Sequence, residues 1–159
     1  MSKEPLKFEQ LNERQRAGVE IIRKGGNVLF TGPAGTGKST LLRFLKSENK
    51  HMAITASTGI AAICVEGSTL HGWLGIGVGD KPASEVAARH LKKKDGRFFK
   101  LVMANILAID EISMIDEHIL NLTDEVLRLT RKNPRPFGGV QLVLFGDFLQ
   151  LPPVAKDGR

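Results

Sequence analysis

Residues 32–39 have the types and spacing that bind the phosphates of a nucleotide. They follow the pattern G-x-x-x-x-G-K-[ST] as Gly32, Pro33, Ala34, Gly35, Thr36, Gly37, Lys38 and Ser39. The glycines let backbone N–H groups turn inward around a β-phosphate, and the helix expected after them adds its positive end. Lys38 is suited to bridge the β- and γ-phosphates, and Ser39 to bind Mg²⁺. A glycine-rich turn that only ends a strand is the alternative, and the strand and helix expected around it favour the phosphate loop.

Two acidic residues and a glutamine can supply the rest of a hydrolytic site. Asp110 and Glu111 follow the apolar run Ile106–Ile109, which predicts that Asp110 lies near the metal and that Glu111 faces the attacking water. An acidic pair at a strand end is otherwise a solvated turn, and the phosphate loop favours catalysis. Gln150 follows a third apolar run and can contact the γ-phosphate, although a solvated turn glutamine has the same pattern. The predicted catalytic residues are Lys38, Glu111 and Gln150, and the predicted metal ligands are Ser39 and Asp110.

Two further segments have the composition of a surface that binds single-stranded nucleic acid. Thr55–Ala62 places small hydroxyl residues at a strand end and a helix start, where O–H and N–H groups can meet a phosphate. Gly67–Trp73 adds hydroxyls, a histidine and the chain's only tryptophan. Trp73 can act as a base-stacking platform or can pack in the core, and the sequence leaves both alternatives open.

The composition is that of a globular domain with an excess of positive charge. Its 159 residues fit one domain, and no apolar run approaches the ~20 residues that span a membrane. A net charge of +6 makes nucleic acid a candidate partner, although Lys92–Lys94 and Arg128–Lys132 are expected to be solvated helix ends. The single cysteine, Cys64, lies in an apolar run and is expected to be a buried, inert thiol. The histidines show no ligand spacing, so a histidine metal centre is not expected.

Helix and strand patterns alternate along the chain, which predicts an α/β domain with a mostly parallel sheet and helices on both faces. Asn12, with Gln15 three residues later, is expected to cap a first helix that ends at Gly25-Gly26. The other expected elements are strands at 28–30, 52–55, 106–109 and 140–145 and helices at 38–46, 59–65, 82–94 and from 116 onwards. In the last helix the expected core residues are Ile119, Leu122, Val126 and Leu129. Because ligands bind beyond the carboxyl ends of parallel strands, the polar motifs are expected at that edge.

These segments, in this order, resemble the first motor domain of the Pif-one family, the superfamily-one helicases that move 5′→3′. The resembling blocks are Leu11–Gln15, Gly32–Thr40, Thr55–Ala62, Gly67–Gly77, Ile109–Met114 and Pro136–Val154. The last block, from Pro-Phe-Gly-Gly to Leu-Pro-Pro-Val, separates this family from its RecD-like and Dda-like relatives. The resemblance implies a RecA-like P-loop NTPase fold with ATP and Mg²⁺ as cofactors and single-stranded, forked or structured DNA as partner.

The resemblance also implies roles for individual residues. Gln15 would recognise adenine, and Thr40 would complete the nucleotide-binding residues of the phosphate loop. Thr58, Gly59, Thr69 and His71 would lie along single-stranded DNA. These roles come from the family's motifs rather than from spacing alone.

The domain organisation follows from the same resemblance. Residues 1–10 are expected to be a tail, residues 11–159 the RecA-like ATP-binding domain, and residues 74–104 a small inserted element near the point of strand separation. A second RecA-like domain, with its arginine finger, is expected to lie outside this chain, which would then be a fragment of a longer enzyme. The family implies genome maintenance, including DNA repair, recombination and telomere maintenance. A protein of this family is expected inside the cell: in the cytoplasm of a bacterium, or in the nucleus or mitochondrion of a eukaryote.

Two other classes of protein share the phosphate loop. A self-contained small P-loop ATPase, such as a helicase loader, should carry its own sensor arginine and lid after the third motif strand. A small-molecule kinase should show a lid and an acceptor pocket, for which the sequence gives no candidate. A reading frame that stops at Arg159 favours the small ATPase, and one that continues for hundreds of residues favours the helicase. The sequence does not determine the oligomeric state, for which a monomer is the simplest expectation.

Overall fold

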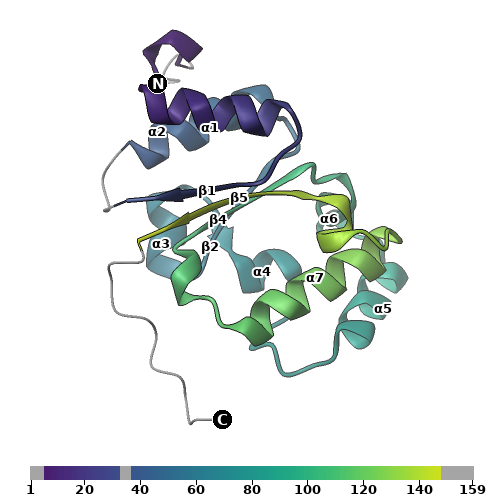
Figure 1. Ribbon diagram of the computed structural model, residues 1–159. Coiled ribbons are helices and arrows are strands. Elements are labelled where there is room, and N and C mark those ends of the chain that lie inside the picture. Colours follow the sequence, from purple (N-terminus) through teal and green to yellow (C-terminus); the bar gives the residue numbers. More distant parts are fainter. Residues whose placement is uncertain (1–5, 33–36, 148–159) are drawn as a thin grey trace.

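The computed structural model describes residues 6–32 and 37–147, which build one twisted sheet with helices packed against both faces (Figure 1). The sheet has five parallel strands in the order β1-β5-β4-β2-β3. The strands are β1 (Val28–Thr31), β2 (Ala53–Ala56), β3 (Ser68–Thr69), β4 (Ile106–Asp110) and β5 (Gln141–Gly146). The predicted α/β class, with a parallel sheet between helices, is confirmed.

The helices divide between two hydrophobic cores, one on each face of the sheet. The first core takes side chains from α1 (Glu13–Arg23), α2 (Lys38–Glu48) and α3 (Gly59–Cys64). The second takes them from α4 (Leu70–Leu74), α5 (Ala83–Lys93), α6 (Gly96–Met103) and α7 (Glu117–Arg131). Three short 3₁₀ turns complete the described elements: η1 (Phe8–Gln10), η2 (Ile112–Met114) and η3 (Pro136–Gly139). No helix in the described ranges is both long and apolar enough to cross a membrane.

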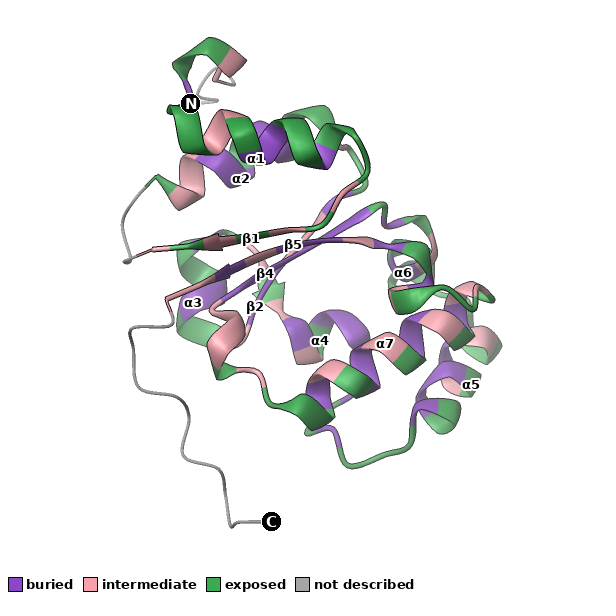
Figure 2. Ribbon diagram, in the orientation of Figure 1, coloured by how far each residue is buried: buried purple, intermediate pink, exposed green. Residues whose placement is uncertain are grey.

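The middle strand β4 belongs to both cores because its side chains alternate between the two faces of the sheet. Ile106 and Ala108 pack in the first core, and Leu107 and Ile109 in the second. All five residues of β4 are buried (Figure 2), as expected for a parallel strand covered on both sides. The position of Asp110 at the end of β4 is therefore fixed by neighbouring strands and by helices on both faces.

The second face differs from the sequence prediction in its helices and at Leu129, and it decides one open alternative. The two helices α4 and α6 have 5 and 8 residues, too few for a helical period to stand out, and neither was predicted. Trp73 is only 9% exposed and packs in the second core, which decides between its two alternatives. Leu129 was predicted to be buried and this is wrong: the residue is 46% exposed, because α7 buries the neighbouring Val126 and Leu127 instead.

Two predicted boundaries remain predictions. Phe8, within the expected tail, is partly buried against the first core. Within the expected inserted element, Leu74, Val86 and Leu101 are buried in the second core together with side chains of α7. Both segments thus contribute to the packing of the domain.

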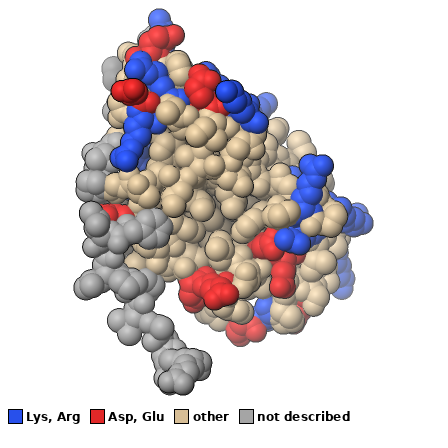
Figure 3. Space-filling model, viewed as in Figure 1, with Lys and Arg blue, Asp and Glu red and all other residues tan. Residues whose placement is uncertain are grey.

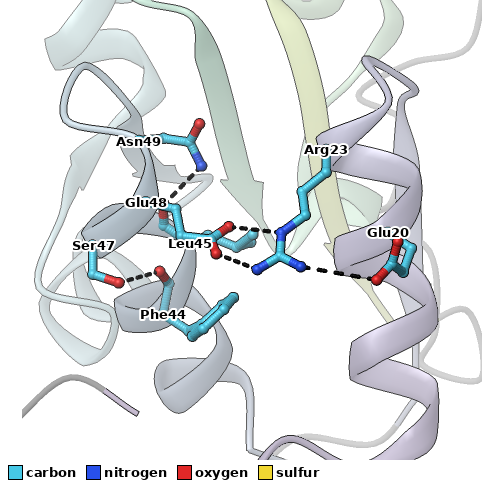
Figure 4. A network of polar contacts seen from close by, with 7 residues as sticks. All are labelled: Glu20, Arg23, Phe44, Leu45, Ser47, Glu48 and Asn49. Atoms are coloured by element: carbon cyan, nitrogen blue, oxygen red, sulfur yellow. Dashed lines mark hydrogen bonds and ion pairs between the residues drawn. The ribbon is translucent and has the colours of Figure 1, made fainter. Parts of the chain in front are cut away.

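Arg23 ties α1 to α2 on the first face (Figure 4). Its guanidinium makes two hydrogen bonds to the carboxylate of Glu48, and it lies 3.8 Å from Glu20 one turn earlier on its own helix. The same group stacks 4.6 Å from the ring centroid of Phe8 and 5.9 Å from that of Phe44. A planar, bidentate cation can satisfy all these partners at once, whereas a lysine cannot.

Arg131 holds the second face together and is not the solvated helix end that was predicted. Its Nη1 donates to the carbonyl oxygens of Leu101, Val102 and Ala104 at 2.7, 2.7 and 2.9 Å, and its Nε to that of Gly138 at 2.8 Å. The first three carbonyls lie at the end of α6, where a helix lacks internal donors. Sequence pattern could not show this role, because the carbonyls come from residues about thirty positions away.

His90 fastens α5 to the end of α4 in its neutral form. The ring is 3% exposed, and Nε2 lies 2.7 Å from the carbonyl oxygen of Leu74. Burial lowers the pKa of His90 below its ordinary value; the bond to Leu74 opposes this and the charges of Arg89 and Arg97 add to it. The unfolded chain therefore takes up the proton at a higher pH than the folded chain does.

We expect acid to weaken the fold through His90. The contribution of the neutral ring is fully present above about pH 6.5, and is lost as the pH falls toward the lower pKa of the folded state. Urea unfolding at several pH values should show the free energy of unfolding falling by at most about 1.4 kcal/mol per pH unit from this group. His90→Gln should flatten that slope, and His51→Gln, at an exposed position, should not. Equal slopes for the two variants would contradict the assignment.

Candidate functional site

The predicted site residues are distributed along one edge of the sheet, the edge at which all the parallel strands end. Residue 32 follows β1, Asp110 ends β4, and Thr69 ends β3. Thr58 lies two residues beyond the end of β2. In the order β1-β5-β4-β2-β3, the phosphate loop and acidic pair therefore occupy one half of the edge, and the hydroxyl residues occupy the other half.

The helix after the phosphate loop begins at a residue that has to be glycine. Gly37 is the N-terminal cap of α2 and has φ +77°, a left-handed conformation that costs other residues free energy. A side-chain carbon at Gly37 would also come within 2.9 Å of Gln15 Nε2. Gln15 donates from that nitrogen to the carbonyl oxygen of Gly37 at 3.2 Å. The residue predicted to recognise adenine is thus attached to the end of the phosphate loop.

Gln15 reaches this position because of the cap at the start of α1. Asn12 Oδ1 accepts from Gln15 N at 2.8 Å, and Gln15 Oε1 accepts from Asn12 N at 3.0 Å, which confirms the predicted capping box. Arg14, the residue before Gln15, donates to the carbonyl oxygen of Thr31 at 3.3 Å. The first turn of α1 is therefore joined to both ends of the segment that surrounds the phosphate loop.

An ion pair connects the phosphate-loop lysine to the acidic pair. Lys38 Nζ lies 3.0 Å from Asp110 Oδ2, and the Asp110 side chain is only 4% exposed. The other carboxylate oxygen, Oδ1, accepts from Glu111 N at 2.9 Å. Both oxygens of the buried carboxylate are therefore satisfied, and the charged ends of β4 and α2 are held together without a ligand.

Glu111 has an uncommon backbone conformation. Its φ and ψ of 55° and 51° are left-handed, which costs a side-chain-bearing residue of order 1–3 kcal/mol. This conformation turns the chain sharply after β4, so that the N–H of Glu111 points back to Asp110. Strain of this kind is found at functional sites, where surrounding packing maintains it.

An open pocket of about 660 Å³ lies over these residues. The described residues that line it include Gly37, Lys38, Ser39 and Thr40 from the phosphate loop and its helix, and Asp110 and Glu111 from β4 and the following turn. Thr58, Ile60, Ala61 and Cys64, from the start and body of α3, line it from the side of the hydroxyl residues. The fold thus brings residues 37–40, Asp110 and Glu111 together around one cavity, whereas Gln15 is not among the residues that line it.

Cys64 is exposed, and the prediction of a buried thiol was wrong. The short helix α3 turns Ala61 and Ala62 toward the first core, which places Ile60, Ile63 and Cys64 on its outer side (Figure 2). Ile60 and Ile63 are 80% and 78% exposed. One side of a short apolar helix such as α3 faces solvent. The sequence does not show which of its apolar residues are exposed there.

The residues present fit a magnesium ion rather than a metal held by the protein alone. Within the described parts of the chain there is no group of three or more His, Cys, Asp or Glu residues that could hold a metal. Mg²⁺ in nucleotide sites keeps several waters and takes one or two protein ligands together with substrate phosphates. Ser39 and Asp110 line the same pocket and provide the hydroxyl and carboxylate for such a site.

Two of the predicted DNA residues also cap helices. Thr58 Oγ1 accepts from Ala61 N at 3.2 Å at the start of α3, and Thr69 Oγ1 accepts from Gly72 N at 3.1 Å at the start of α4. A hydroxyl that accepts one bond keeps its own hydrogen for another partner. Gly59 has open space around its Cα, and His71 is half-buried on α4.

Five predicted site residues lie outside the described residues: Pro33, Ala34, Gly35, Thr36 and Gln150. Ser57 is a polar group at this edge that the sequence did not single out among its neighbouring hydroxyls. Its Oγ is buried without a hydrogen-bond partner in the described structure, and its N–H donates to the carbonyl oxygen of Asp110 at 3.1 Å. Only the pairing of β2 with β4 brings these two residues together.

These elements define a P-loop nucleotide-binding domain. Strand β1 leads through a turn that ends in Gly-Lys-Ser into a helix, and the acidic residue paired with that lysine ends β4, which lies two strands from β1 in the sheet. The family model described as "PIF1-like helicase" matches residues 10–159, and the chain belongs to this family. It is 47% identical over 154 residues to the ATP-dependent DNA helicase RRM3 of Saccharomyces cerevisiae, covering 91% of this chain and 21% of that protein. The chain spans between 17% and 24% of the length of the curated relatives it matches.

Solved structures of the family show the same fold. The crystal structure of Pif1 helicase from Candida albicans superposes with a TM-score of 0.82 at 41% identity, over 92% of this chain and 34% of that one. The Bacteroides Pif1 helicase in complex with ADP-AlF3 and ssDNA superposes with a TM-score of 0.77 at 39% identity, with the same coverage of 92% and 34%. The fold is therefore RecA-like, as the resemblance implied.

The ion pair between Lys38 and Asp110 should contribute to stability. Lys38→Ala leaves a nearly buried carboxylate without its partner, which we expect to cost about 1–3 kcal/mol because Lys38 itself is partly exposed. Adding Asp110→Asn removes the unpaired charge and should restore part of the loss. Urea unfolding of both single variants and the double variant measures the coupling, which should be about 1 kcal/mol or more. Strictly additive effects would show that the pair contributes nothing.

Proposed function

We propose that this chain is the ATP-hydrolysing motor domain of a 5′→3′ DNA helicase that binds single-stranded DNA. The observation that carries the proposal is the Lys38–Asp110 pair at 3.0 Å, beside Glu111 in one pocket, at an edge shared with Thr58 and Thr69. Its relative from Bacteroides was solved with ADP-AlF3 and ssDNA, which supports both ligands. The chain covers about a fifth of the length of its relative. DNA unwinding, which is an activity of the whole relative, is therefore also proposed for this protein.

Nucleotide binding uses groups that the fold already holds in place. Lys38 changes its partner from Asp110 to the β- and γ-phosphates, while Asp110 keeps its hydrogen bond from Glu111 N. Ser39 and Asp110 would hold Mg²⁺, which would supply Lewis-acid stabilisation of the charge on the phosphates. Glu111 orients and polarises the attacking water. The strained turn keeps Glu111 at the pocket while its N–H fixes the carboxylate of Asp110.

Gln15 binds the base in this scheme. Its Oε1 is engaged in the cap of α1, and one Nε2 hydrogen is engaged with Gly37. The second Nε2 hydrogen is left for an acceptor nitrogen of adenine. Since the same side chain contacts the end of the phosphate loop, base recognition and phosphate binding are joined through Gly37.

Single-stranded DNA lies along the other half of the edge. The free hydroxyl hydrogens of Thr58 and Thr69 donate to phosphate oxygens, and Gly59 allows the backbone to approach closely. Thr58 lines the nucleotide pocket as well, and Ser57 is bonded to Asp110. A shift of Asp110 on nucleotide binding therefore moves Ser57, and through Ser57 it moves the DNA contact Thr58. Such a protein works where DNA is: the cytoplasm of a bacterium, or the nucleus or mitochondrion of a eukaryote.

The proposed chemistry predicts that Glu111→Gln separates binding from hydrolysis. The amide keeps the shape and the backbone strain but cannot polarise water, so ATP turnover should fall about 10²- to 10⁴-fold. Affinity for a fluorescent ATP analogue should change only a few-fold, whereas Lys38→Ala should weaken both. Steady-state phosphate release and equilibrium binding measure the two quantities. Loss of binding and turnover together in Glu111→Gln would make Glu111 a structural residue or a metal ligand.

The DNA contacts can be tested without disturbing the helix caps. Thr69→Asp keeps an oxygen for the N–H of Gly72 and adds a favourable charge at the start of α4. It removes the hydroxyl hydrogen and repels phosphate, so affinity for oligo(dT) should fall at least tenfold, on the order of 1.4 kcal/mol. Thr69→Ser, which keeps both acceptor and donor, is the matched control and should bind like the wild type. Unchanged binding by Thr69→Asp would remove Thr69 from the DNA track.

A further inference from the structure

Almost all of the chain's excess positive charge is concentrated at one corner. Residues 89–100 contain six Lys and Arg residues and one carboxylate, so this stretch carries +5 of the total net charge of +6. The other 147 residues together are close to neutral. In Figure 3, Lys and Arg side chains lie on the side of the molecule where Figure 1 places α5, α6 and the end of α7, and others lie near α1 at the top.

The fold forces these cations together. Helix α5 ends at Lys93 and α6 begins at Gly96, so only two residues turn the corner between them. The exposed cations on either side of the corner are Lys92, Lys93, Lys94, Arg97 and Lys100. Within the described ranges no ion pair holds any of these five side chains. Asp95 is the one carboxylate whose charge acts on Lys93 and Arg97, so five cations share a single anion at this corner.

Helix-end electrostatics account for only some of these residues. Lys92 and Lys93 lie in the last turn of α5, where cations interact favourably with the helix dipole. Arg97, by contrast, is the second residue of α6, at the end of a helix where a positive charge is unfavourable. The one carboxylate at the corner, Asp95, is engaged in accepting the N–H of Phe98 as the cap of α6 at 3.1 Å. The domain tolerates unfavourable charge here, which points to a ligand with negative charge.

An exposed aromatic ring lies on α6, the helix that also carries Arg97 and Lys100. Phe99 is 55% exposed, and its ring meets that of Phe98 edge to face at 5.3 Å between centroids. Met103, one turn further along α6, is 52% exposed. Cations interleaved with an exposed aromatic ring are typical of surfaces that bind single-stranded nucleic acid, where phosphates meet the charges and a base stacks on the ring.

This corner is also close to the proposed DNA track. Helix α4 starts after Thr69 and ends with Gly75 as its cap, and its five residues span about 7–8 Å. A side-chain carbon at Gly75 would come within 3.0 Å of Arg97 Nη1, so Arg97 lies at the far end of this short helix. A strand that leaves Thr69 and follows α4 therefore arrives at Arg97.

We propose that Lys92, Lys93, Lys94, Arg97, Phe99 and Lys100 form a second contact surface for single-stranded DNA, which continues the track beyond Thr69 and His71. This inference rests on the proposed function. The surface supplies the positive charge that the DNA track lacks. The track residues Thr58, Gly59, Thr69 and His71 contribute hydroxyls, backbone and an imidazole but no permanent cation. The basic corner provides the charge that attracts the phosphates, and Phe99 stacks with a base.

Salt dependence gives the sharpest test. The triple variant Lys92→Gln, Lys93→Gln, Arg97→Gln removes three charges, and each lost phosphate contact lowers the slope of log K against log[salt] by about 0.7. For binding of fluorescent oligo(dT) by the full chain, the magnitude of the slope of log K against log[salt] should therefore decrease by about 2. The matched control, Lys24→Gln, Arg43→Gln, Lys50→Gln, removes three exposed cations from the first face and should keep the wild-type slope. Equal slopes for the two triple variants would overturn the proposal.

Stacking is tested separately. Phe99→Ala should weaken oligo(dT) binding roughly 5- to 150-fold without changing the salt slope, and Phe99→Trp should restore it. Poly-glutamate has charge but no bases, so it should compete poorly and should not respond to Phe99→Ala. Equal competition by poly-glutamate, or tighter binding of a blunt duplex than of oligo(dT), would assign the corner to another partner and refute the proposal.

The outcome can be distinguished from failure of the proposed function. If the triple variant matches its control while Thr69→Asp loses affinity, the inference about the corner is wrong and the DNA track stands. If the wild-type chain binds no oligo(dT), the proposed function itself fails. Phosphate release by the triple variant in the absence of DNA should equal that of the wild type, because the corner lies outside the nucleotide pocket.

Discussion

The parallel pairing of β4 with β5 on one side and β2 on the other is the constraint on which the site depends. A parallel strand can be central only if both faces are covered, and here the two cores cover it with separate sets of helices. The pairing fixes the height of Asp110 relative to the ends of β2 and β1. It therefore fixes two contacts that join Asp110 to other elements: the ion pair with Lys38 and the backbone hydrogen bond from Ser57.

The carboxyl edge of the sheet has two halves that carry different groups of predicted site residues. The nucleotide residues follow β1 and β4, the hydroxyl residues follow β2 and β3, and Thr58 lines the pocket between the two groups. The two groups of residues are joined directly, because the N–H of Ser57, the residue before Thr58, donates to the carbonyl oxygen of Asp110.

Several of the predicted site residues at this edge also have a structural task. Thr58 and Thr69 close the first turns of α3 and α4 while keeping a hydroxyl hydrogen free. Gln15 completes a capping box and touches the phosphate loop. Lys38 satisfies the buried Asp110. Alanine substitutions at these positions therefore remove a structural contact as well as the predicted ligand-binding group.

The sequence by itself determined the motifs and the alternation of elements, because a phosphate loop, a capping box and a buried apolar strand are local patterns. It predicted Lys38, Ser39, Asp110 and Glu111 as the chemical groups, and the structure places all four around one pocket at the carboxyl edge of the sheet. It could not determine the exposed side of α3, which made Cys64 appear buried, nor the role of Arg131, whose carbonyl partners are distant in sequence. It correctly predicted that the lysine run is an exposed helix end, since Lys92 and Lys93 lie in the last turn of α5. Only the tertiary structure shows that α5 and α6 meet in a corner of two residues, because the packing of two helices is not a local property of the sequence.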